Sequence, residues 1–132
     1  MSIGKTSEEF LEAIRAFNSS ISKCEKAKAK LKADSPQRKW VDRQLESFYV
    51  SVSLINNSLS EPETAKERYA ETELRNADKT LRQLIVKCEK LPEKFKEGSP
   101  QHTLAIRRLQ AFHIAETLIA RELEKTYESR LE

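Results

Sequence analysis

The sequence predicts an all-α protein, an up-down-up-down four-helix bundle built from two tandem helical hairpins. Three observations predict this fold: good helix formers dominate the composition, apolar residues recur at helical spacing, and one stretch of the chain occurs twice. Glycine occurs at only two of the 132 positions, and three of the four prolines stand at expected helix starts. The chain therefore has few points at which long helices would break.

The repeated stretch covers residues 23–48 and again residues 87–112. Lys-Cys-Glu-Lys and Ser-Pro-Gln recur in both copies at an offset of 64 residues, without a gap. Matching apolar positions extend the repeat over nearly the whole chain, as in a duplicated structural unit. We interpret residues 1–132 as one domain with a first repeat at about residues 5–60 and a second at about residues 61–132. An approximate two-fold axis is expected between them.

The first hairpin is expected to begin with a helix over residues 7–33. Thr6 and Glu9 form a capping box at its start. Asp34-Ser35-Pro36 ends this helix and begins the next, because the residue before a proline disfavours helical geometry. Ser35 is a suitable N-cap, and Pro36 suits the first helical position. The second helix is expected to reach about residue 59.

The second hairpin is expected to begin at another capping box, formed by Ser60 and Glu63. The third helix should continue to about residue 97. Pro92 lies inside it, and this predicts a kink or break near Leu91, since proline lacks an N–H group and crowds the preceding turn.

A fourth helix is expected from Pro100 to about Arg130. Gly98 is a natural cap for the end of the third helix, and Ser99 can cap the start of the fourth. Short connections make successive helices antiparallel. Both hairpin turns should therefore lie at the same end of the bundle.

That end is expected to be basic. Residues 23–43 contain eight Lys or Arg against three acidic residues, whereas the whole chain has a net charge of only +3. Such polarity suits a phosphate group or an acidic partner. The alternative is that these lysines complement the negative ends of helix dipoles and need no partner. The residues expected to contact an anion or partner are Lys30, Lys32, Arg38, Lys39 and Lys96.

Asp78, His113 and Glu116 form a polar group on otherwise apolar helix faces, with Asp78 and Glu116 expected within about a turn of each other. Two carboxylates and an imidazole are ligands that a divalent metal accepts. Di-iron bundles, however, pair two Glu-x-x-His motifs with two further glutamates. Here a single His-x-x-Glu occurs, so Glu116 is better explained as an exposed residue beside Arg82 or Arg121. We expect no metal, cofactor or catalytic residue.

Cys24 and Cys88 occupy equivalent positions in the repeat. They could approach each other as a redox pair, but buried cysteines more often act as small apolar residues. Two cysteines in a chain of this size do not form a disulfide framework.

The composition and these motifs favour a small, non-enzymatic bundle that binds another protein, as a monomer or a homodimer. Binding of an anion or nucleic acid at the basic turn end is the second hypothesis, and a metal-dependent enzyme using Asp78, His113 and Glu116 is the third. No apolar run is long enough to span a membrane, and the N-terminus lacks an apolar signal core. A cytoplasmic location is therefore expected.

Overall fold

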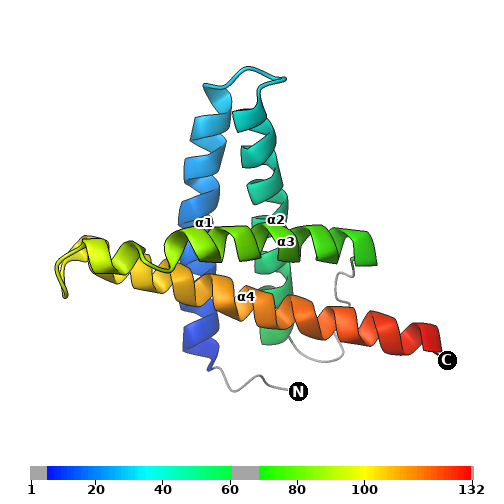
Figure 1. The fold of residues 1–132 in the computed structure, drawn as a ribbon. Coiled ribbons are helices and arrows are strands. Elements are labelled where there is room, and N and C mark those ends of the chain that lie inside the picture. Colours follow the sequence, from blue (N-terminus) through cyan, green and yellow to red (C-terminus); the bar gives the residue numbers. More distant parts are fainter. Residues whose placement is uncertain (1–5, 61–68, 132) are drawn as a thin grey trace.

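The computed structural model describes residues 6–60 and 69–131, and these residues form four helices and no strand. The all-α four-helix bundle is therefore confirmed. Figure 1 shows the elements in chain order. They are α1 (Ser7–Ala29), α2 (Pro36–Leu59), α3 (Glu71–Cys88), the short 3-10 helix η1 (Leu91–Lys94) and α4 (Pro100–Leu131).

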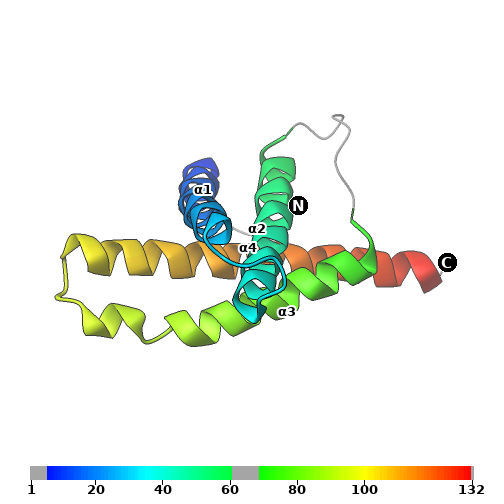
Figure 2. The same ribbon diagram turned by 90° about the horizontal axis from the view of Figure 1, so that it is seen from above.

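The four helices pack as two hairpins laid crosswise. Helices α1 and α2 form one hairpin, and α3 with α4 forms the other, which runs across the first (Figures 1 and 2). Helix α1 contacts α2 and α4, while α2 contacts all three other helices. The turn between α1 and α2 and the turn before α4 consequently point in different directions (Figure 1). The expectation that both turns share one end is wrong.

Small buried side chains explain why the second hairpin can lie across the first. Helix α2 buries Ser47 and Ser51, one turn apart, and α4 buries Ala111 and Ala115 at the same spacing. The separation of two packed helices depends on the side chains at their contact, so small buried residues on α2 and α4 permit close packing between the hairpins. Ser47 also donates a hydrogen bond from Oγ to the carbonyl oxygen of Ala77 at 2.9 Å, which ties α2 to α3.

Three phenylalanines from three helices form the centre of the core. Phe17 of α1, Phe48 of α2 and Phe112 of α4 are each at most 2% exposed. Their ring centroids are 5.6, 5.7 and 5.9 Å apart. Such separations are typical of favourable aromatic pairs. The three rings therefore form one cluster that connects the first hairpin to the second.

Positions 64 residues apart are buried alike in the two hairpins. The pairs that are buried in both include Phe10 and Leu74, Ala13 and Ala77, Phe48 and Phe112, Leu54 and Leu118, and Ile55 and Ile119. Both halves therefore present the same apolar face to the core. The common origin of the two halves stays a prediction.

The first hairpin has the predicted start and turn. The capping box is present, with Thr6 Oγ1 accepting from the Glu9 N–H at 3.1 Å. Ser35 caps α2 by accepting from the Arg38 N–H at 3.1 Å. Helix α1 ends at Ala29, earlier than predicted. Arg38 Nη1 donates to the Leu31 carbonyl at 3.3 Å, which satisfies a backbone group just beyond the helix end.

The predicted break at Pro92 is confirmed, since α3 ends at Cys88 and Pro92 lies in η1. Gly98 follows with φ of +84°, a conformation that favours glycine. Ser99 Oγ then accepts from the His102 N–H at 3.2 Å and caps α4. The second hairpin thus closes through a 3-10 helix and a glycine turn.

The predicted start of the third helix is wrong. Ser60 ends α2, where its Oγ donates to the Asn56 carbonyl at 2.9 Å. Its expected capping partner, Glu63, lies outside the described residues. Helix α3 begins at Glu71, where the Glu73 carboxylate accepts from the Ala70 N–H at 3.0 Å. A carboxylate in the first turn satisfies exposed N–H groups there, so the helix starts where Glu73 can reach back.

Truncating a central ring tests the importance of the crossing. Phe48→Ala should lower the free energy of unfolding by about 3–5 kcal/mol, because it removes a fully buried ring and leaves a cavity between the hairpins. Urea denaturation followed by circular dichroism measures this loss. Tyr49→Ala, at the neighbouring position with half of its side chain exposed, is the control and should change stability by about 0.5 kcal/mol or less. Equal losses would contradict a core centred on Phe48.

Candidate functional site

Trp40 lies half-buried near the start of α2, where it packs against the edge of the hydrophobic core. Two cations lie over its indole ring. The Arg43 guanidinium carbon, one turn further along α2, is 5.4 Å from the ring centroid. The Lys87 ammonium nitrogen, at the end of α3, is 4.7 Å from it. Both distances are within the range of cation–π attraction, so Trp40 holds two basic side chains from different hairpins beside each other.

An open groove of about 610 Å³ surrounds this cluster, between α2 and α3. We call it the Trp40 groove, and it is lined by Trp40, Arg43, Arg82, Gln83, Val86 and Lys87. Val86 is 72% exposed. A single exposed aliphatic side chain is ordinary on a protein surface, but this one lies beside the Trp40 ring in the same groove. The groove therefore combines an aromatic and an aliphatic surface with a basic rim.

The groove has more positive charge than its surroundings neutralise. Arg82 Nε pairs with Asp78 Oδ2 at 2.9 Å. In the described part of the chain, neither Arg43 nor Lys87 has a carboxylate within ion-pair distance. Two cations of the groove are therefore not neutralised by any acidic side chain of residues 6–60 or 69–131.

A second pocket of about 690 Å³ continues along α2 and α3 and shares Arg43 and Gln83 with the Trp40 groove. Its charges are mixed, because Glu46 and Glu73 line it together with Arg43 and Lys79. The two pockets together give this face a basic, apolar end and a mixed, polar end.

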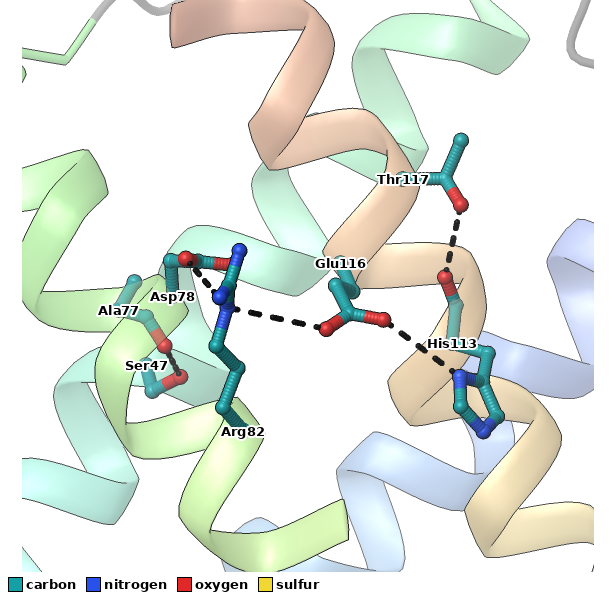
Figure 3. A network of polar contacts seen from close by, with 7 residues as sticks. All are labelled: Ser47, Ala77, Asp78, Arg82, His113, Glu116 and Thr117. Carbon is teal, nitrogen blue, oxygen red and sulfur yellow. Dashed lines mark hydrogen bonds and ion pairs between the residues drawn. The ribbon is translucent and has the colours of Figure 1, made fainter.

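Asp78, His113 and Glu116 lie near each other, as predicted, but Arg82 lies between the two carboxylates (Figure 3). Arg82 Nε lies 2.9 Å from Asp78 Oδ2 and 3.9 Å from Glu116 Oε2. Glu116 Oε1 lies 3.5 Å from His113 Nδ1. The guanidinium thus lies between the carboxylates that a metal would bridge. Within the described ranges, no group of three His, Cys, Asp or Glu side chains is placed to hold a metal ion.

This network of ion pairs links α3 to α4. Arg82, one of the two neighbours predicted for Glu116, is confirmed. Glu116 is half-buried, so the expectation of an exposed side chain is wrong. The Asp78 side chain is 16% exposed, and this partial burial raises its pKa above the usual value. The attraction of Arg82 partly offsets the effect, and the nearby charge of Glu116 adds to it. The ionised carboxylate of Asp78 is therefore slightly disfavoured by folding.

Cys24 and Cys88 are free thiols and are half-buried, on α1 and at the end of α3. Burial raises the pKa of each thiol above its ordinary value, although the positive charge of Arg108 acts in the opposite direction on both. Cys24 Sγ is 4.0 Å from Gln44 Oε1, a weak hydrogen bond. The thiolate is the nucleophilic form of cysteine, so a raised pKa lowers the reactivity of both thiols.

The five residues expected to contact an anion are not all near each other. Lys30, Lys32, Arg38 and Lys39 lie around the turn between α1 and α2, whereas Lys96 lies on the other turn (Figure 1). Arg38 is half-buried and bonded to the Leu31 carbonyl. A cation that satisfies a carbonyl beyond a helix end supports the helix-dipole explanation of these charges.

The sequence did not identify the Trp40 groove as a site. Trp40 was visible as the sole tryptophan beside an apolar stripe, but Val86 and Lys87 lie some 46 and 47 positions away in the other hairpin. Their approach to Trp40 depends on how the two hairpins cross, and helical periodicity does not specify that crossing.

Comparison with protein-family models, with curated proteins and with solved structures finds no match to this chain. None of the helices in residues 6–60 and 69–131 combines the length and apolar character that a membrane crossing requires.

The raised pKa of Asp78 gives a prediction with a definite sign. The folded chain binds this proton more tightly than the unfolded chain, so stability falls as pH rises through the folded pKa. Asp78→Asn should remove this decline and be at least as stable as the wild type at neutral pH. Urea denaturation across the acidic range measures it.

Glu71→Gln is the control of opposite sign, because a hydrogen bond from Arg75 lowers the pKa of Glu71. Glu71 contributes stability above its unfolded pKa and loses that contribution as pH falls through the lower folded value. This variant should therefore be less stable at neutral pH and indistinguishable in acid. A neutral-pH loss for Asp78→Asn instead would show that its pairing with Arg82 outweighs the desolvation.

The two thiols should react slowly in the folded protein. Their raised pKa values reduce the thiolate fraction, so alkylation by iodoacetamide at neutral pH should be slower than in guanidinium chloride, and its rate should rise at higher pH. Stability should correspondingly decrease above the ordinary thiol pKa. Mass spectrometry of time points measures both sites. Native rates equal to those of the unfolded chain would contradict protected thiols.

Proposed function

We propose that this chain is a small, non-enzymatic, cytoplasmic protein-interaction module that binds its partner through the Trp40 groove. One observation supports this proposal above the others: the half-buried Trp40 ring and the exposed Val86 side chain lie beside two cations, Arg43 and Lys87, that have no acidic partner among the described residues. Aromatic and arginine side chains are the residues that most often dominate the energy of protein interfaces.

The size of the groove is consistent with a protein partner that also covers its surroundings. Stable interfaces bury about 1,200–2,000 Å² in total, which is more than a groove of this kind provides alone. The second pocket extends the same face along α2 and α3. A partner that follows both pockets would bury Trp40 at one end and make polar contacts at the other.

Two unpaired thiols are typical of a reducing compartment, which supports the cytoplasmic location that we propose. The polar group at Asp78 does not favour catalysis, because Arg82 pairs with both carboxylates. The turn lysines give little support to nucleic-acid binding. In the crossed fold the two turns point in different directions, so their lysines do not form one basic surface (Figure 1).

A charge placed on the apolar surface tests the proposal. Val86→Asp should remove binding of the partner, because it puts an isolated carboxylate on the surface that the partner covers. Immobilised wild type and variant are compared for the proteins that they retain from a lysate of the source organism. The control is Ser22→Asp, the exposed position 64 residues earlier on α1, which adds the same charge away from the groove.

The expected result is a protein retained by the wild type and by Ser22→Asp, but not by Val86→Asp. Circular dichroism of each variant shows that the fold is kept. The proposal is overturned if no retained protein depends on Val86.

A further inference from the structure

We propose that the Trp40 groove binds an acidic amphipathic helix, whose carboxylates pair with Arg43 and Lys87 while one apolar side chain packs on Trp40 and Val86. This inference rests on the proposed function and adds the chemical class of the partner. The groove lies between two helices, and the described residues contain no strand whose edge could accept an extended peptide. A helix laid in a groove is the recognition mode that such a surface permits.

The charges of the groove select a negatively charged partner. All three of its ionisable lining residues, Arg43, Arg82 and Lys87, are basic. Arg82 is already paired with Asp78, so the free charge is on the two residues over the indole ring. Exposed ion pairs contribute about 0.2–1 kcal/mol each. The apolar contact therefore provides most of the affinity, and the charges set orientation and association rate.

The same geometry disfavours a nucleic-acid strand as the occupant. The pocket that continues the groove contains Glu46 and Glu73. A phosphate backbone is negative along its whole length and would meet these carboxylates, whereas a peptide can have an acidic turn followed by a neutral one.

The corresponding positions on α4 and α1 lack this surface. At the offset of 64 residues, Leu104 replaces Trp40 and Ser22 replaces Val86. The two cations are kept as Arg107 and Lys23, but Arg107 Nε lies 3.7 Å from Glu12 Oε2. The chain should therefore bind one acidic helix, and not two.

Fluorescence of Trp40, the sole tryptophan, reports directly on occupation of the groove. The probe is a synthetic helical peptide with one leucine flanked by glutamates one turn away on either side. Comparison peptides replace the glutamates by lysine or the leucine by serine, and a single-stranded DNA oligomer is a further comparison. Titrations are made at about 50 and 200 mM salt, since charge contacts weaken with screening.

The expected result is a saturable change with one acidic peptide per chain, weaker at the higher salt and absent for the lysine peptide. The double variant Arg43→Glu, Lys87→Glu should lower the affinity by about tenfold or more, because two attractions become repulsions. The matched double variant Arg107→Glu, Lys23→Glu makes the same change in net charge and should retain the wild-type affinity. The comparison peptide in which serine replaces the leucine should also bind more weakly than the acidic peptide.

Three results would overturn the inference: equal binding of the lysine peptide, an equal loss in the matched double variant, or binding of DNA without binding of the acidic peptide. The last would assign the groove to nucleic acid. If the acidic peptide fails but a protein is still captured in a Val86-dependent manner, the proposed function stands and the acidic helix is excluded. If that capture also fails, both proposals fall.

Discussion

Phe17, Phe48 and Phe112 pack together where the two hairpins cross, and the arrangement of the remaining structure depends on this contact. Each ring comes from a different helix, so neither hairpin can complete the cluster alone. Burial of aromatic area is the largest favourable contribution that single side chains make to folding. Helix α2 also contacts both helices of the second hairpin, and its buried serines leave room for this close packing.

The crossing also determines what each face of α3 does. Its apolar face, with Leu74 and Leu81, is buried in the core. Asp78 faces α4 and is held in an ion-pair network through Arg82. The end of the helix places Lys87 over the Trp40 ring of α2. Core packing, inter-helix ion pairs and the candidate binding surface are thus combined on one helix of five turns, because α3 meets α4 along its length and α2 across it.

The two halves of the chain are alike inside and different outside. Positions such as Ile55 and Ile119 are completely buried in both, whereas Trp40 and Leu104, or Val86 and Ser22, differ at the surface. Core positions are restricted by the volume that they must fill, but a surface position away from special features changes stability little. Surface residues of the two hairpins can therefore diverge without loss of the fold. Such divergence permits the face between α2 and α3 to present a site that the corresponding positions on α4 and α1 do not.

The sequence by itself determined the local features. The capping box at Thr6, the N-cap at Ser35, the break at Pro92 and the turn at Gly98 follow from backbone hydrogen bonding and allowed dihedral angles, which neighbouring residues set. The sequence also predicted that Asp78 lies near Glu116, because the two residues are separated from the turn at Gly98 and Ser99 by similar numbers of residues on antiparallel helices. Only the tertiary structure decided the crossing of the hairpins and the meeting of Trp40 with Val86 and Lys87. Helical periodicity specifies which face is buried but not the angle at which two buried faces pack, and that angle depends on side-chain volumes from distant parts of the chain.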